Sequence, residues 1–173
     1  GLFRLLQAMG ADLTIINERE VGGEPVADLV ARHSALTGID VPPDIAPSMI
    51  DEFPVFFVAA AHASGTTRTS GLDELRVKES DRLALMAHGL ARIGVSVEEK
   101  EDGLVITGHG GDPLGAANGT PTIAAELDHR IAMSFAVAGL ATRGGLIIDD
   151  MSAVATSFPG FTAMLDRLRG GAA

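Results

Sequence analysis

The chain has 173 residues, 46% of them hydrophobic, and a mean hydropathy of +0.26, so it is long and apolar enough to fold and is not a disordered protein. Its formal net charge of −10 argues against nucleic acid and anionic membranes as partners, although local basic groups can still hold a small anion. There are no cysteines, which excludes disulfides and thiolate metal sites and fits a reducing cytoplasm, where we expect the protein to act.

The first residues predict an amphipathic helix followed by a strand. Residues 1–10 lack an initiator Met and already have a helical pattern without a capping residue, and Leu13–Ile16 is strand-like. This beginning predicts a truncated piece of a longer protein, although removal of a tag would also leave an initial Gly.

The next elements are a buried helix and a strand. The run Phe53–Ala61 is apolar nearly all round, which predicts a helix inside the fold, and Thr66–Ser70 is a predicted strand. The run is too short to cross a bilayer, which takes roughly 20 residues.

A second kind of helix follows. Apolar side chains recur at spacings of three, four and three from Leu83 to Ile93, which predicts an amphipathic helix over residues 80–93. Gly94 ends this helix, and Val95–Glu98 alternates as a strand.

The last third of the chain repeats these elements. Residues 108–119 are predicted to form a surface loop, Ile131–Ala141 a second buried helix, Leu146–Asp149 a strand and Phe161–Leu168 a final amphipathic helix.

An internal repeat organises these elements. Ile50-Asp51, which precedes the first apolar run, is echoed 77 positions later by Leu127-Asp128, which precedes the second. The repeated unit is a strand, an amphipathic helix, two strands and a buried helix, with one complete unit and incomplete pieces on either side. We therefore expect an α/β fold in which sheets and amphipathic helices surround buried helices.

Charged residues gather where the predicted helices begin. Asp51-Glu52 and Asp128-His129-Arg130 precede the buried helices, and Lys78–Arg82 precedes or opens the amphipathic one. Helix amino termini carry unpaired N–H groups and a partial positive charge, so these positions favour anions. If residues 78–82 are helical, Lys78 and Arg82 share one patch with Glu79, where two cations would clamp a phosphate while the carboxylate faces the reacting carbon.

Simpler interpretations stay open at this point. Asp51 and Asp128 suit ordinary N-caps, and Lys78–Arg82 suits a solvated helix start with weak surface ion pairs. His129 suits a hydrogen-bonded structural role, whereas Arg130 needs a partner because it adjoins an apolar helix. The residues alone indicate an anion-binding α/β domain without an assigned reaction or a metal site.

Four blocks resemble the 5-enolpyruvylshikimate-3-phosphate synthase family. They are Pro47–Pro54, Leu75–Leu83, Leu127–Met133 and Thr156–Phe161, in the family's order and at similar spacings, and the first is similar to the bacterial glyphosate-tolerant class. The resemblance covers essentially the whole chain, so residues 1–173 are expected to form part of the carboxy-terminal domain of such an enzyme, with the amino-terminal domain absent. It implies repeated units around buried parallel helices whose amino termini face an interdomain cleft.

The resemblance also implies a reaction. The family joins shikimate 3-phosphate to phosphoenolpyruvate through a tetrahedral intermediate and releases phosphate, without a cofactor or metal. Asp51 would contact the shikimate hydroxyls and act as the base on the 5-hydroxyl, and Glu79 would manage the proton at the phosphoenolpyruvate methylene.

Four further residues are implied to bind the substrates. Lys78 would contact phosphoenolpyruvate and the 5-hydroxyl region, Arg82 and Arg130 would hold the phosphoenolpyruvate anion, and His129 would support that arrangement.

Two positions depart from the family pattern. Thr156 stands where many members have a Lys, which leaves one phosphoenolpyruvate contact to come from elsewhere, and Glu74 stands where some have an Asn.

Two alternatives from different classes remain. A related enolpyruvyl transferase acts on UDP-N-acetylglucosamine, but the blocks around Lys78–Arg82 and Asp128–Arg130 favour the shikimate enzyme. The other is a non-catalytic anion-binding module, because the cleft needs both domains. We expect the isolated chain to fold, to bind substrate anions weakly and to turn over essentially nothing, with oligomerisation as a consequence if apolar surface is uncovered.

Overall fold

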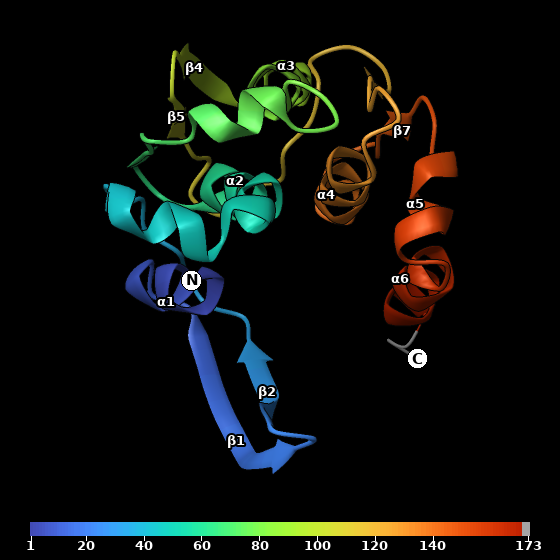
Figure 1. The fold of residues 1–173 in the computed structure, drawn as a ribbon. Coiled ribbons are helices and arrows are strands. Elements are labelled where there is room, and N and C mark those ends of the chain that lie inside the picture. Colours follow the sequence, from blue (N-terminus) through green and yellow to red (C-terminus); the bar gives the residue numbers. More distant parts are fainter. Residues whose placement is uncertain (171–173) are drawn as a thin grey trace.

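The computed structural model describes residues 1–170, in which small sheets lie around inner helices (Figure 1). Helix α1 (Leu2–Ala8) leads into the hairpin of β1 (Asp12–Val21) and β2 (Glu24–Arg32), and two 3-10 turns, η1 (Pro43–Ser48) and η2 (Ile50–Glu52), precede α2 (Phe53–His62). No side chain caps α1, as the sequence predicted.

The complete repeat unit follows in the predicted order. It consists of β3 (Thr66–Arg68), the 3-10 turn η3 (Asp73–Val77), α3 (Arg82–Arg92), β4 (Ser96–Lys100), β5 (Gly103–Thr107), the short β6 (Thr122–Ile123) and α4 (His129–Gly139). The chain continues through β7 (Ile147–Ile148), α5 (Ser152–Ser157) and α6 (Phe161–Gly170). The prediction of repeated α/β units is confirmed.

The strands form small sheets that are separate from one another. Strands β3, β5 and β4 form an antiparallel sheet in that order, and β6 pairs with β7 in parallel. The β1–β2 hairpin forms its own two-stranded sheet and projects from the body of the molecule (Figure 1).

Helix α2 lies at the centre of the core. Its Phe53, Phe56 and Phe57 are fully buried and their rings contact one another at centroid distances of 5.7 to 6.4 Å. Burial of such rings is the main source of stability in a domain of this size. The predicted inner position of this helix is confirmed.

Helix α4 lies beside α2 (Figure 1) and packs closely on α3. A Cβ at Gly89 of α3 would come within 2.2 Å of the Phe135 ring, so this contact requires glycine. The Arg130 Nη1 donates to the Asp51 backbone oxygen at 2.9 Å, which joins the first turn of α4 to the segment that leads into α2. The two inner helices therefore begin at the same end, in agreement with parallel helices, although Met133 and Val137 leave one side of α4 half-exposed.

The start of α3 corrects one expectation. The helix begins at Arg82, and its N-cap is Asp81, whose carboxylate accepts from the Ala84 N–H at 3.0 Å. Residues 78–80 precede the helix because this cap ends the helical backbone there. The i,i+4 patch of Lys78 with Arg82 therefore does not form. Gly94, with φ +87°, ends the helix region as predicted.

Within residues 1–170, no helix combines the length and the apolar character that crossing a membrane would demand.

Candidate anion-binding site

Three helices begin next to one another, and Arg82 connects their amino termini. Only 1% of its side chain is exposed. Its Nε donates to the Asp128 Oδ2 at 2.8 Å, its Nη1 to the Asp51 Oδ1 at 3.0 Å, and its Nη2 to Glu79. The guanidinium thus has a carboxylate partner at the start of α2, α3 and α4.

Asp128 is the fully buried partner in this network. Its Oδ1 accepts from the Arg130 N–H at 2.9 Å and caps α4, and its Oδ2 also accepts from the Ser80 hydroxyl at 2.9 Å. Burial alone would raise the pKa of Asp128, but the hydrogen bonds from Arg82 and Ser80 outweigh it, so the pKa lies below its ordinary value. The N-cap interpretation of Asp128 is confirmed, and the same carboxylate also holds Arg82.

Arg82 remains charged in this buried position. Burial alone would lower its pKa, but its hydrogen bond and attraction to Asp128, with Glu79 and Asp51 adding to them, raise the pKa above the ordinary value. A permanently charged guanidinium beneath two exposed carboxylates is the electrostatic centre of the site.

Asp51 has a different environment. It lies in η2, and the N-cap of α2 is Glu52, which makes no side-chain cap hydrogen bond, so the N-cap interpretation of Asp51 is wrong. Its carboxylate is 41% exposed and lies between two arginines, 3.0 Å from Arg82 and 3.5 Å from Arg130. It is therefore accessible to a ligand.

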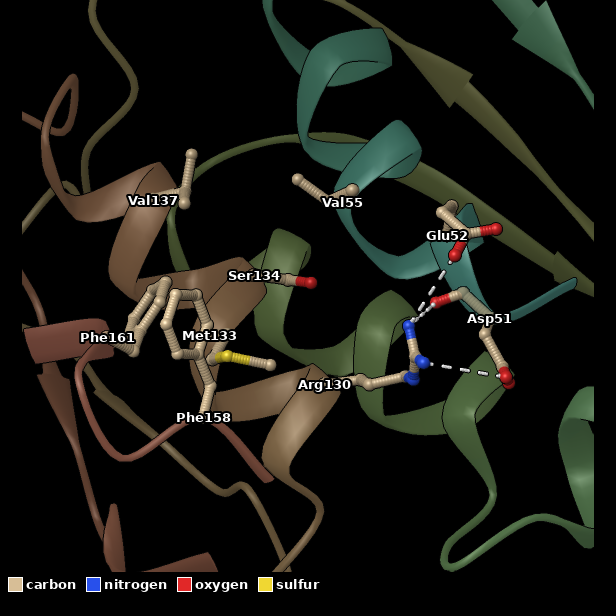
Figure 2. A pocket seen from close by; sticks show the side chains of 9 residues that line it. All are labelled: Asp51, Glu52, Val55, Arg130, Met133, Ser134, Val137, Phe158 and Phe161. Carbon is tan, nitrogen blue, oxygen red and sulfur yellow. Dashed lines mark hydrogen bonds and ion pairs between the residues drawn. The ribbon is translucent and has the colours of Figure 1, made fainter. Parts of the chain in front are cut away.

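A pocket opens beside this carboxylate, with an empty volume of about 510 Å³. Figure 2 shows Arg130 pointing toward Asp51 and Glu52 at one end, with Phe158 and Phe161 at the other. Between them the walls come from the inner helices: Val55 from α2, and Met133, Ser134 and Val137 from α4. The pocket therefore has a charged end and an apolar end.

Two predicted binding residues lie outside the Arg82 network. Lys78 forms an ion pair with Glu74 of η3, so a residue of the family block contacts the residue that departs from the family pattern just before it. His129 is the half-buried first residue of α4. Glu79, by contrast, does meet Arg82 as the three-residue spacing predicted.

Thr156 is exposed on α5 and donates its hydroxyl to the Ala153 backbone oxygen at 2.7 Å. It therefore has a local role in its own helix, and no cation occupies this position.

The backbone before Asp128 is strained. Glu126 and Leu127 are consecutive residues with φ of 48° and 59°, in the left-handed region that is costly for side chains other than Gly and Asn. Such strain persists where the surroundings hold the chain, and it is common at functional sites. Here it turns the chain so that Asp128 enters the buried position.

The sequence did not predict that Asp128 contacts both Arg82 and Ser80. One signal was available. An arginine at the start of an amphipathic helix needs a carboxylate partner if its side chain is buried. Nothing in the spacing shows that this carboxylate lies 46 positions further along the chain.

The local charges are unbalanced. Four carboxylates gather around two guanidinium groups, which leaves the site negative: Asp51, Glu52, Glu79 and Asp128 against Arg82 and Arg130. The exposed carboxylates can accept or deliver protons, but binding of anionic ligands needs further cations.

The fold and this site define an α/β protein with the architecture of enolpyruvyl transferases. The solved structure of the enolpyruvyl transferase NikO from Streptomyces tendae has the same fold, with a TM-score of 0.65 at 20% identity over 96% of this chain and 34% of that one. EPSP synthase from Acinetobacter baumannii is more similar, with a TM-score of 0.90 at 48% identity over 95% of this chain and 38% of that one.

Residues 1–165 match the family described as EPSP synthase (3-phosphoshikimate 1-carboxyvinyltransferase), and the chain belongs to this family. Proteins named 3-phosphoshikimate 1-carboxyvinyltransferase from Sphingopyxis alaskensis and Zymomonas mobilis are 62% and 59% identical to it, over 98% and 97% of the chain. The chain spans 37% of the length of each of these relatives.

Proposed function

We propose that residues 1–173 form part of the carboxy-terminal domain of an enzyme that transfers the enolpyruvyl group of phosphoenolpyruvate to the 5-hydroxyl of shikimate 3-phosphate. Family membership and the 37% share of the relatives' length support this proposal. The observation that carries it is the pair of exposed carboxylates, Asp51 and Glu79, held on the buried Arg82 where the helices begin. The cytoplasm is the proposed location.

Each carboxylate has a proton-transfer role in this proposal. Asp51 accepts the proton of the 5-hydroxyl as its oxygen bonds to the enol carbon of phosphoenolpyruvate, and Glu79 delivers a proton to the methylene. The tetrahedral adduct then expels phosphate, which leaves with the proton that Asp51 holds. Glu79 takes a proton back from the new methyl group, which restores the carbon–carbon double bond. Atoms and charges balance without a cofactor.

The binding roles follow the charges. Arg130 is 32% exposed and lines the charged end of the pocket, where it can reach the phosphoenolpyruvate carboxylate. Arg82 is covered by Asp51 and Glu79, so a substrate anion contacts it only when one of these carboxylates moves aside. Lys78 and His129 complete the proposed set.

The negative balance of the site supports a shared cleft. Both substrates are multiply charged anions, and two guanidinium groups among four carboxylates cannot compensate them. The rest of the longer protein must therefore supply the additional cations, and the isolated chain should be inactive.

The test compares phosphate release from phosphoenolpyruvate and shikimate 3-phosphate by three preparations. They are this chain alone, this chain with a separately made amino-terminal part of the Sphingopyxis alaskensis enzyme, and a chimera in which this chain replaces the matching segment of that enzyme. We expect turnover by the chimera and none by the chain alone. A folded chimera without turnover would overturn the proposed reaction, and turnover by the chain alone at the chimera's rate would overturn the shared cleft.

A further inference from the structure

Arg76 has an unusually complete set of hydrogen bonds for a residue outside the site. Its side chain is 25% exposed and lies in η3, two residues before Lys78. The Nε donates to the Glu101 backbone oxygen at 2.6 Å, and Nη2 donates to the Lys100 backbone oxygen at 2.5 Å. The Nη1 donates to Glu99 and to Asp81, at 2.9 Å each.

These bonds join two separate parts of the fold. Glu99 and Lys100 are the last residues of β4 and Glu101 begins the turn to β5, whereas Asp81 is the N-cap of α3. Arg76 directly precedes the loop of residues 77–81 and bonds to Asp81 at its other end. It therefore connects both ends of this loop to the β4–β5 hairpin. This loop carries Lys78 and Glu79.

The loop has little else to hold its first half. Val77 is 79% exposed and the Glu79 side chain is 54% exposed, so apolar burial contributes little there. The neighbouring Leu75 is fully buried and anchors η3, and Ser80 bonds to Asp128 at the far end. Between these points Lys78 pairs with Glu74 and Glu79 with Arg82, and Arg76 joins the stretch to the end of β4.

Only a guanidinium can make this set of contacts. Its planar group presents five N–H donors in fixed directions, and here they reach two carbonyl oxygens and two carboxylates at once. The hydrogen bond to Glu99, followed by those to Asp81, raises the pKa of Arg76, so the group stays charged. A lysine offers one point of attachment and cannot replace the fork.

We propose that Arg76 is a positioning residue, which fixes the loop of residues 77–81 so that the Glu79 carboxylate is held at Arg82. The inference rests on the proposed function, because it acts through the proton-transfer role of Glu79. A displacement of about 1 Å in a reacting group can cost on the order of a hundredfold in rate, so the expected loss in kcat is about 10- to 100-fold.

The experiment uses the chimera with Arg76→Ala and Arg76→Lys, and Arg68→Ala as the matched control. Arg68 also joins two segments, through an ion pair with Asp40 at 3.3 Å, but lies outside the site. We expect Arg76→Ala to lower kcat more than it raises KM and to speed amide hydrogen exchange in residues 77–81. Arg76→Lys should restore part of the rate, and Arg68→Ala should change neither quantity.

A second comparison separates positioning from a purely structural role. If Arg76 acts through Glu79, adding Arg76→Ala to Glu79→Gln should lower kcat by no more than about twofold further, because the two changes affect one function. A full additional loss, or faster exchange with an unchanged kcat, would overturn the inference. If the wild-type chimera is inactive, the proposed function fails instead, and hydrogen exchange decides alone: unchanged exchange in Arg76→Ala overturns the anchoring and faster exchange supports it.

Discussion

Asp51 and Asp128 occupy equivalent positions in the two copies of the internal repeat, yet their surroundings differ. Asp128 is fully buried, caps α4 and holds the Nε of Arg82, whereas Asp51 is 41% exposed, caps nothing and meets the Nη1 of the same arginine. The Asp128 carboxylate is therefore part of the buried framework of the fold, whereas the Asp51 carboxylate is accessible to a ligand.

The difference indicates how a repeat fold can build a reactive site. A buried carboxylate satisfies most of the charge of Arg82 and orients it, which leaves the second carboxylate free to exchange its partner for a ligand. Stability should therefore depend mainly on Asp128 and chemistry mainly on Asp51.

The largest expected effect on stability comes from Asp128→Ala. The change leaves a buried guanidinium without its main partner and removes the cap of α4, so we expect the free energy of unfolding to fall by about 3–5 kcal/mol. Asp51→Ala should cost less than about 1 kcal/mol, because the Asp51 carboxylate is 41% exposed and Arg82 keeps Asp128 and Glu79 as partners. Urea unfolding followed by circular dichroism measures both, and equal losses would contradict the assigned difference.

The positions of helices α2, α3 and α4 could be predicted before the structure, because they depend on local patterns. The apolar runs predicted the inner positions of α2 and α4, and the spacing of three, four and three predicted the buried face of α3. The beginning of α3 was misplaced, because the cap at Asp81 competes with the helical pattern that spacing alone suggested.

The site was predicted less completely, since its contacts join distant segments. The pairs of Arg82 with Glu79 and of Lys78 with Glu74 are local, but only the first followed from spacing. The contact of Arg82 with Asp128 arises from the packing of α3 on α4, which no periodicity encodes. The catalytic and binding roles themselves stay predictions.

A double-mutant cycle with Arg82→Met sharpens the same comparison. We expect a coupling free energy of about 2–3 kcal/mol between Arg82 and Asp128, and less than about 1 kcal/mol between Arg82 and Asp51. The measurement is the unfolding free energy of each single and double variant. A stronger coupling to Asp51 would reverse the proposed division between the two carboxylates.

Acid should reduce the contribution of Asp128 to the unfolding free energy. Folding lowers the pKa of Asp128, so its contribution to stability is present above the unfolded pKa of about 4 and is lost as the pH falls through the folded value. We therefore expect unfolding free energy to decrease from about pH 4 downward. Asp128→Asn should flatten this dependence in a pH series of urea titrations, and an unchanged slope would contradict the assignment.

The smallest expected effect is at Leu127, one residue before Asp128. Leu127 is 63% exposed with φ 59°, so Leu127→Gly should change the unfolding free energy by no more than about 0.5 kcal/mol, as relief of strain offsets the added chain entropy. Ile50, its counterpart, is packed against the core, so Ile50→Gly should cost about 1–3 kcal/mol. Thermal unfolding of the two variants compares them, and a larger loss at Leu127 would show that its left-handed backbone is not strained.

The division of roles between the two carboxylates is tested most directly by kcat of the chimera with Asp51→Asn. A general base contributes on the order of 10²- to 10⁴-fold to rate, so we predict a loss of that size while the unfolding free energy stays within about 1 kcal/mol of the parent. If the Asp51→Asn chimera keeps a kcat within about threefold of the parent, Asp51 is not the base and the accessible carboxylate of the repeat has no role in the chemistry.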